Sequence, residues 1–443
     1  MVSWIDRQFA EFGAKVACYE RGRTWTYDDL ASEVDRFEAL LCPTVGSEPV
    51  VIAIRMAGTM EALAAIFAIR RLKQVALPLS LEMPEAEQVE AQRIAGAAYV
   101  LSEEGLLAEP SVRDASGLID QLAERGHAGL ILFSSGTSGE PKGMLHDLDA
   151  LLDRYQTVRP RADVTVQLLL ADHIGGLDSA FRTFFAGSTL VVPETRTAVA
   201  VGEAVERHQV NILPASPTFL NLMLLAHVPE KFNCSSLEVI AYGAEPMPAG
   251  LLARLVESFP QAIFQQKFGT SETGAVRIKS QRSDSLYFRI KDSDVEWRVQ
   301  DDELWLKTSS RILGYLNADE SSLEADGWYR TGDLVEETDD GYLRIIGRQS
   351  AWINVGGQKV HPAEVERVLA EIEGVDACSV FSKPAAVTGS MVACVIVTSS
   401  DRDLRSWKRL IRSHCRGRLA DWKIPVSIEL RDELSITDRL KRG

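Results

Sequence analysis

The sequence has few of the features that mark metal-binding, disulfide-rich or secreted proteins. Its six cysteines are scattered and no two have CxxC spacing, which argues against a zinc site or a disulfide framework and favours the cytoplasm. None of the seven histidines forms an HxxxH or HxH pair. No apolar run reaches the ~18 residues of a transmembrane helix. The N-terminal segment contains acidic residues and lacks the apolar stretch of a signal peptide, so we expect no secretory signal.

The charge balance also narrows the function. The chain carries a formal net charge of −15, which argues against nucleic acid as the main partner. An anionic ligand must therefore be held by local donors against the field of the whole protein. With 46% apolar and 25% charged residues over 443 positions, the composition is that of an ordinary globular protein of two or three domains.

The order of strand-like and helix-like segments predicts an α/β fold. Apolar strands such as residues 49–56 alternate with helical patterns, and residues 23–41 are predicted as a short strand followed by a helix, as in parallel sheets covered by helices. Residues 287–310 alternate apolar and polar side chains, which predicts antiparallel strands in a small barrel-like part. A compact α+β unit follows. We therefore expect a large N-terminal domain of residues 1–348 and a small C-terminal domain of residues 349–443.

A loop rich in glycine and hydroxyl groups lies within residues 131–147, ILFSSGTSGEPKGMLHD. Backbone N–H groups of such a turn can point at one anion, hydroxyls add donors and a lysine adds charge, which together suit a polyphosphate. A Walker P-loop is excluded because Pro141, not glycine, precedes the lysine. A flexible surface loop is the alternative. The candidate phosphate-binding residues are Ser134, Ser135, Gly136, Thr137, Ser138, Gly139 and Lys142.

Two motifs at strand ends contain groups suited to a nucleotide. The segment AYGAEPMP puts Gly243 and Ala244 at the carboxyl end of a strand, where α/β sheets bind ligands. The segment FGTSETG begins with an aromatic ring, Phe268, that offers a flat face to a base. Its Glu272 is suited to Mg²⁺ that bridges phosphates, and Thr270 and Ser271 are candidate phosphate donors.

Two later motifs add a carboxylate and a cation. The segment GWYRTGDL contains Asp333, suited to a ribose diol, and GRQSAWINVGGQKV contains Arg348. Each motif taken alone is also compatible with a plain turn or a cap. Their combination and their order are therefore the informative feature.

The set closely resembles the adenylate-forming superfamily of acyl- and aryl-CoA ligases, carrier-loading adenylation enzymes and luciferases. The resemblance spans nearly the whole chain, and includes SSGTSGEPKG, FGTSETG, ELWLKTSSRILGYL, YRTGDL and GRQSAWINVGGQKVHPAEVE in the expected order. It implies a large domain that binds ATP and a carboxylic acid, and a small mobile C-terminal domain. It also implies ATP/AMP contacts from the loop of residues 134–139, with Lys142, and from Gly243, Ala244, Glu245, Phe268, Gly269, Thr270, Ser271, Asp333 and Arg348, and a Mg²⁺ site at Glu272.

The resemblance implies a catalytic lysine near the C-terminus. The family signature is Pro-x-Thr-x-x-Gly-Lys, and here Thr437 and Lys441 keep its spacing while Ser435 and Leu440 replace the proline and glycine. Lys441 is therefore the candidate, together with Lys142 and Glu272, for catalysis. The alternative is a solvated terminal lysine. Ser350 stands where the family hinge usually has Asp or Lys, and it is the expected hinge residue.

The resemblance places the acid pocket around residues 168–192. In members that activate amino acids, an aspartate there pairs with the α-ammonium group, but Asp172 and Asp178 are out of register for that role. The spacing is more similar to acyl- and aryl-CoA ligases, including the o-succinylbenzoate type. We therefore expect an aryl or medium acyl acid without an α-ammonium group. The expected pocket residues are His173, Gly176, Leu177, Gly243 and Gly274, with a helix-start role as the alternative for His173.

The family chemistry joins the acid to ATP as an acyl-adenylate with release of pyrophosphate, and a thiol then takes the acyl group. The sequence ends two residues after Lys441, so we expect the thiol to come from CoA or from the phosphopantetheine arm of a separate acyl carrier protein. The basic segment of residues 403–423 suits either acceptor, and CoA is favoured. A catalytically silent binding protein of the same fold is the third possibility, which only the altered C-terminal signature supports.

Overall fold

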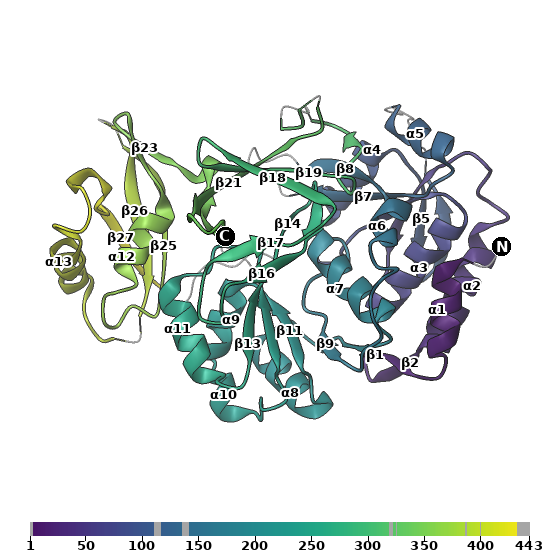
Figure 1. The fold of residues 1–443 in the computed structure, drawn as a ribbon, viewed down its shortest axis with the longest axis horizontal. Coiled ribbons are helices and arrows are strands. Elements are labelled where there is room, and N and C mark those ends of the chain that lie inside the picture. The colour runs from purple at the N-terminus through teal and green to yellow at the C-terminus, as the bar shows by residue number, and fades with distance from the viewer. Residues whose placement is uncertain are drawn as a thin grey trace.

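Two seven-stranded sheets form the large N-terminal part of the computed structural model (Figure 1). The structure describes residues 3–109, 117–134, 141–318, 322–324, 326–385, 388–398 and 400–431. In the first sheet every neighbouring pair is parallel except the edge pair of β1 and β2. Its order is β13 (Ile263–Gln266), β12 (Val239–Tyr242), β11 (Ile212–Ala215), β9 (Val164–Val166), β10 (Thr189–Val191), β1 (Val16–Glu20) and β2 (Arg23–Thr26).

The second sheet is parallel at its centre and antiparallel toward its edges. Its order is β20 (Gly314–Tyr315), β8 (Lys142–Asp147), β7 (Gly129–Ser134), β4 (Val75–Pro78), β3 (Val51–Arg55), β5 (Ala97–Ser102) and β6 (Gly105–Ala108).

Helices follow the strands, as the alternating pattern predicts. Thr26 is the N-cap of α2 (Tyr27–Leu41). Its side chain accepts from the backbone N–H of Asp29, and the Asp29 carboxylate accepts from the backbone N–H of Thr26, which forms a capping box that fixes the first turn. The helices are α1 (Trp4–Phe12), α2 (Tyr27–Leu41), α3 (Thr59–Arg71), α4 (Glu85–Ala95), α5 (Leu118–Arg125), α6 (Leu148–Asp153), α7 (Ile174–Phe185), α8 (Ala198–His208), α9 (Pro217–Leu225), α10 (Val228–Lys231) and α11 (Ala249–Ser258).

The largest apolar core is formed by α1, α2, α3 and α7 together with strands of both sheets. Phe9, Phe67, Phe181 and Phe185 meet there, with ring centres between 5.4 and 6.2 Å apart in the contacting pairs. A second core lies where α8, α9 and α11 cover β11, β12 and β13 (Figure 1). Helix α7 is thus held in the first core while its other face remains available to a ligand.

A third sheet of six antiparallel strands follows. This is the part that the sequence predicts as barrel-like, and β16 and β18 are its two edges. Its order is β16 (Ile278–Ser280), β17 (Phe288–Ile290), β22 (Leu343–Arg348), β21 (Tyr329–Glu337), β19 (Glu303–Thr308) and β18 (Val295–Gln300), and a separate hairpin is formed by β14 (Phe268–Thr270) and β15 (Gly274–Val276).

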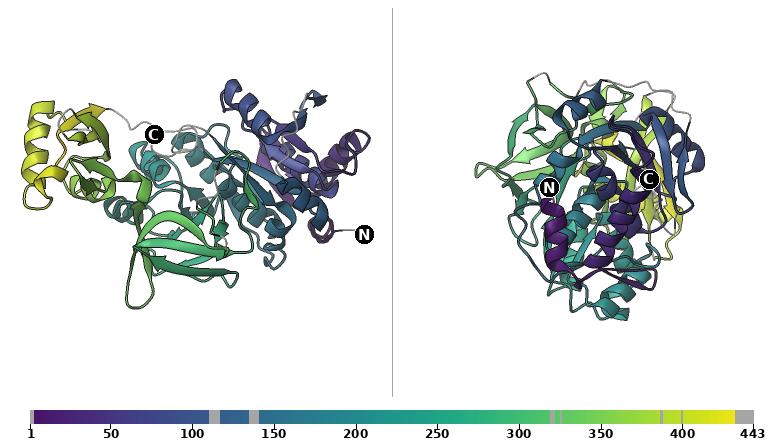
Figure 2. Two further views of the ribbon diagram at one scale, coloured as in Figure 1. Left: turned by 90° about the horizontal axis from the view of Figure 1, so that it is seen from above. Right: turned by 90° about the vertical axis from the view of Figure 1, so that its right-hand side faces the viewer.

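The C-terminal part has an apolar core of its own. The buried residues of that core all fall between Ile353 and Ile428, and Trp407 at its centre is fully buried. Figure 2 shows these elements gathered at one end of the molecule. They are β23 (Ile353–Val355), β24 (Gln358–Val360), α12 (Pro362–Leu369), β25 (Ala377–Ala385), β26 (Gly389–Val397), α13 (Leu404–Cys415) and β27 (Ser427–Arg431), after a 3-10 turn at Gln349–Ala351.

The predicted fold class, α/β with a large N-terminal part and a small α+β C-terminal part, is confirmed. No helix in the described ranges is long and apolar enough to cross a membrane, as the sequence predicts.

Candidate functional site

The predicted phosphate loop is the connection between two antiparallel strands, β7 and β8. Strands β7 and β8 pair so that Ser134 lies opposite Lys142. The side chain of Asn317 anchors the far side of the tip, because its Oδ1 accepts from the backbone N–H of Gly143 at 2.9 Å and its Nδ2 donates to the carbonyl of Pro141 at 2.9 Å. The predicted residues Ser135, Gly136, Thr137, Ser138 and Gly139 lie outside the described residues.

Tyr315 joins the phosphate loop to the predicted metal motif. The ammonium group of Lys142 lies 5.8 Å from the centre of its ring, at the outer limit of a cation–π contact. Its hydroxyl donates to Oε1 of Glu272 at 3.0 Å. Two groups that are distant in the sequence thus meet around one buried aromatic side chain. Tyr315 belongs to the segment ELWLKTSSRILGYL, but nothing in its residue type pointed to this role.

The FGTSETG segment forms the tight β14–β15 hairpin. A Cβ on Gly269 would stand 2.5 Å from the carbonyl oxygen of Gly274, so the close approach of the two strands requires glycine. The hydroxyl of Thr270 is buried in the turn, where it accepts from the backbone N–H of Thr273 at 3.1 Å. Ser271 and Glu272 are half-buried at the tip.

Phe268 is more deeply packed than the sequence suggests. Its ring stacks on that of Phe288 with centres 5.8 Å apart, and only 7% of the residue is exposed. It borders the ligand cavity described below, but most of its surface belongs to the core beneath the third sheet.

Asp333 and Arg348 form an ion pair on neighbouring strands. They are opposite one another in β21 and β22, and Nε of the arginine lies 2.9 Å from Oδ1 of the carboxylate. Arg348 also donates to the carbonyl of Thr331 at 2.7 Å. Burial raises the pKa of Asp333 to about 6, an effect that Arg348 opposes and that the negative charges of Glu272 and Glu303 reinforce. The negative charge of Glu272 therefore acts on the ionisation of Asp333.

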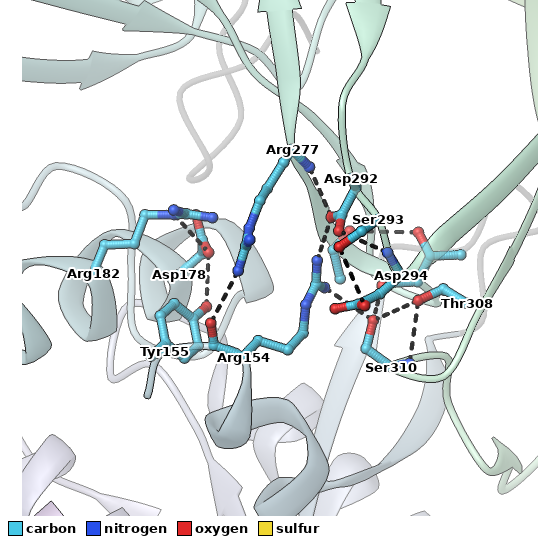
Figure 3. Close-up of polar contacts among 12 residues, drawn as sticks. Arg154, Tyr155, Asp178, Arg182, Arg277, Asp292, Ser293, Asp294, Thr308 and Ser310 are labelled. Atoms are coloured by element: carbon cyan, nitrogen blue, oxygen red, sulfur yellow. Dashed lines mark hydrogen bonds and ion pairs between the residues drawn. The ribbon is translucent and has the colours of Figure 1, made fainter. Parts of the chain in front are cut away.

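A buried ion pair lies beneath the β14–β15 turn (Figure 3). Nη2 of Arg154 is 2.6 Å from Oδ2 of Asp292, whose side chain is fully buried. Arg154 also donates to Oγ of Ser310 at 2.9 Å, and that hydroxyl donates to the carbonyl of Thr273 at 3.0 Å. The end of α6, the third sheet and the turn that carries Glu272 are thus connected by one polar network.

A cavity of about 550 Å³ lies between α7 and one face of the first sheet. This volume falls within the roughly 300–1,000 Å³ typical of small-molecule sites. Pro214, Ala241 and Gln265 form one row across β11, β12 and β13 on the cavity wall. Opposite them stands a helical face that contains Gly175, Asp178, Ser179, Arg182 and Thr183.

The cavity contains some of the expected acid-pocket residues and not others. His173, Gly243 and Gly274 line it, as do Ala244 and Gly269 of the nucleotide set. Gly176 and Leu177 do not, because they lie on the opposite side of α7; Leu177 is fully buried in the first core. Gly175, one residue earlier, lines the cavity instead. The segment located the helix correctly, but two adjacent glycines do not show which side of the helix faces the cavity.

Three other residues of the predicted set have specific local roles. Nδ1 of His173 accepts from the backbone N–H of Gly175 at 3.2 Å, so it caps α7 while it lines the cavity. Glu245 accepts the hydroxyl of Thr218 at 2.6 Å near the start of α9 and does not line the cavity. Ser350 lies exposed in the 3-10 turn between the third sheet and the C-terminal part.

Two residues that the sequence did not single out, Tyr155 and Arg182, contact Asp178 on the cavity wall. Tyr155 donates its hydroxyl to Asp178 at 2.7 Å, and Arg182 binds the same carboxylate at 2.9 Å (Figure 3). Asp178 is thus already neutralised, which is why it is unsuited to an α-ammonium group. The i, i+4 spacing of Asp178 and Arg182 was the available signal for this pair.

Taken together, the structure is a two-part α/β fold with the β7–β8 hairpin, two carboxylates at Glu272 and Asp333, and a cavity of a size typical of small-molecule sites. Residues 5–304 match the family of AMP-binding enzymes, and residues 364–441 match the AMP-binding enzyme C-terminal domain. The chain therefore belongs to the AMP-binding enzyme family, which confirms the resemblance drawn from its motifs.

Relatives and solved structures agree with this assignment over nearly the full length. The chain is 24% identical to 2-succinylbenzoate–CoA ligase of Enterococcus faecalis over 96% of its length and 94% of the relative's. It is 26% identical to indoleacetate–CoA ligase of Aromatoleum aromaticum, with 98% and 94% covered. It shares its fold with an anthranilate CoA ligase in complex with anthranoyl-AMP, at a TM-score of 0.80, 19% identity and 99% and 95% coverage.

We predict that Gly176 is required for stability and Gly175 is not. A Cβ on Gly176 would stand 1.9 Å from the carbonyl oxygen of Leu170, which is backbone and cannot move aside cheaply. A Cβ on Gly175 meets only side-chain atoms, the nearest at 3.4 Å. Gly176→Ala should lower the melting temperature by several degrees, equivalent to roughly 1–3 kcal/mol, whereas Gly175→Ala should leave it within about a degree. Thermal unfolding followed by circular dichroism measures both, and equal melting temperatures would contradict this account.

We also predict that ribose binding depends on pH through Asp333. Its pKa of about 6 lies above the usual 3.8, so burial disfavours the ionised form and folding stability from this group falls as pH rises from 4 to 6. Only the ionised carboxylate accepts both hydroxyls of a ribose diol. Affinity for adenosine, which has no titrating phosphate, should drop roughly tenfold from pH 7.5 to 5. Calorimetry on Asp333→Asn should give weak binding without that pH dependence.

Proposed function

We propose that this chain activates a carboxylic acid with ATP to form an acyl-adenylate, releases pyrophosphate, and transfers the acyl group to the thiol of CoA. The convergence on Tyr315 of Lys142 and of Glu272, the latter on a hairpin that also borders the cavity, is the observation that carries this proposal. Membership of the AMP-binding enzyme family and relatives named as CoA ligases support it.

The residues present fit ATP and Mg²⁺. Lys142 and the hairpin tip would hold the β- and γ-phosphates, and Asp333 with Arg348 would hold the ribose. The described residues contain no group of three or more His, Cys, Asp or Glu side chains arranged for a metal, so phosphate oxygens would complete the coordination begun by Glu272. When bound, the ion would neutralise charge on the phosphates.

The protein's own contribution is alignment and charge. The rigid β14–β15 turn holds Glu272 at a fixed position, and Asn317 fixes the hairpin that carries Lys142. A carboxylate is a weak nucleophile toward an anionic phosphate, so orientation and fixed positive charge supply most of the rate enhancement.

We propose an aryl or medium acyl acid without an α-ammonium group as the substrate. Asp178, the carboxylate on the cavity face of α7, is already bound by Tyr155 and Arg182. An ammonium group placed there would be desolvated without a free counter-charge. The relatives' names, which include 2-succinylbenzoate and indoleacetate, point to the same class.

We further propose that residues 349–443 move relative to residues 1–348 between the two half-reactions and carry the catalytic lysine, Lys441. The exposed turn at Ser350 is the proposed pivot. The separate core between Ile353 and Ile428 supports movement as a unit. Lys441 lies outside the described residues.

Two alternatives share the same site. A stand-alone adenylation enzyme would load a separate carrier protein, and a silent member of the fold would bind ligands without turnover. The intact set of Lys142, Glu272 and Asp333 favours an active enzyme. The six free cysteines support a reducing compartment, for which we propose the cytoplasm.

ATP–pyrophosphate exchange with a panel of acids tests the activation step. We expect exchange with aryl or medium acyl acids and none with α-amino acids. Lys441→Ala should slow exchange by roughly two to four orders of magnitude, because it removes a charge from the transition state, while thioester formation from supplied acyl-adenylate should suffer far less. Arg442→Ala, which removes a neighbouring charge, is the control. Absence of exchange with any acid would support the silent alternative.

The acceptor can be assigned by a direct comparison. With the acid fixed, we expect turnover with free CoA and little with phosphopantetheinylated carrier proteins. Turnover with a carrier at micromolar concentration, and none with CoA at millimolar concentration, would instead favour the stand-alone adenylation enzyme.

A further inference from the structure

The cavity is positively charged although the protein as a whole is strongly acidic. Five cationic side chains line it, against three carboxylates, while the chain carries a net charge of −15. Arg196 is paired with Glu82, and Arg161 with Asp163 at 3.8 Å. Arg159 is exposed, and the two remaining cations, Arg182 and Lys267, lie on the wall where α7 faces the end of β13.

On that wall one carboxylate, Asp178, lies near two cations, Arg182 and Lys267, and forms an ion pair with Arg182. Both oxygens of Asp178 are used, because Nε of Arg182 lies 3.1 Å from Oδ1 and 2.9 Å from Oδ2, and the Tyr155 hydroxyl donates to Oδ1 (Figure 3). The negative charge of Asp178 favours both Arg182 and Lys267 in their charged forms, but it contacts only Arg182.

Lys267 is the cation of this wall that has no ion-pair partner among the described residues. It follows β13 directly, and its Nζ donates to Oε1 of Gln265, a neutral group, at 3.0 Å. Among the residues that the structure describes, no carboxylate oxygen lies within 4.0 Å of its ammonium group. Desolvation by the surrounding protein and the nearby charge of Arg182 lower the pKa of Lys267 to about 8, and Asp178 opposes this shift. The side chain of Lys267 nevertheless lines the cavity.

Lys267 is also well placed to contact the acid. Its backbone N–H donates to the carbonyl of Tyr242 at 2.7 Å, which sets it beside Gly243 at the carboxyl end of β12. Phe268, the next residue, borders the same cavity. A ligand in the cavity therefore passes close to the ammonium group.

We propose that Lys267, supported by Arg182, binds a second anionic group of the acid, so that the preferred substrate carries an anionic group in addition to the carboxylate that is activated. This inference rests on the proposed function and narrows its substrate class. An anion would gain a charged hydrogen bond and relieve the repulsion between the two cations. A cationic group would be repelled, and a purely apolar acid would leave the ammonium group desolvated without compensation.

Matched acids test the inference. Each pair has one aryl or medium acyl acid with a second carboxylate and its analogue with a carboxamide at that position. ATP–pyrophosphate exchange should give a kcat/KM about 10- to 100-fold higher for the dicarboxylic member, the range for a hydrogen bond between charged groups. Lys267→Met, which keeps the apolar stem, should abolish the difference, and Lys267→Arg should retain most of it. Lys279→Met, at an exposed lysine of β16, is the control.

The outcomes separate this inference from the proposed function. Equal kcat/KM values within each pair, or an equal loss for both members in Lys267→Met, would overturn the role of Lys267 while leaving acid activation intact. Calorimetric binding of the acids without ATP provides a readout that needs no turnover. A preference of the wild type for the dicarboxylic member there, lost in Lys267→Met, supports the inference even if exchange fails, and its absence contradicts it. Thermal unfolding of each variant confirms that the fold is retained.

Discussion

The ion pair between Arg154 and Asp292 is the contact on which the arrangement of the site depends. It is buried, and each partner has further hydrogen bonds: Arg154 to Ser310, and Asp292 from the backbone N–H of Arg277 at 3.0 Å. Loss of one partner from such a pair strands a buried charge, which typically costs about 3–5 kcal/mol. Ser310, which accepts from Arg154, also donates to the carbonyl of Thr273, so the ion pair helps to fix the position of the turn that contains Glu272. The end of α6, the third sheet and the β14–β15 hairpin are therefore positioned by the same contact.

The sequence predicted the parts of this protein that depend on local chemistry. Glycine positions, hydroxyl-rich turns and the order of motifs are properties of short segments, so the loop before Lys142, the turn at Glu272 and the strand-end position of Gly243 could be anticipated. Asp333 and Arg348 were found as separate candidates, but their ion pair is a consequence of strand register between β21 and β22. The sequence does not contain that register explicitly.

The residues that were missed belong to contacts between distant segments. Tyr315 and Asn317 are ordinary polar side chains until β20 pairs with β8 beside the phosphate loop. Arg154 and Asp292 have no local signal, because neither lies in a motif. The error at Gly176 and Leu177 has a different cause: a helix with apolar residues on most of its surface gives no clear indication of which side meets the ligand.

The closed core of the C-terminal part has a consequence for how this enzyme can change over time. Since every buried apolar residue of that core lies between Ile353 and Ile428, its folding does not rely on the shape of the acid cavity. Substitutions that enlarge, shrink or recharge the cavity fall within residues 158–275 of the N-terminal part. New acid preferences can therefore accumulate by drift in the large N-terminal part while the small C-terminal part stays under unchanged selection for its own stability.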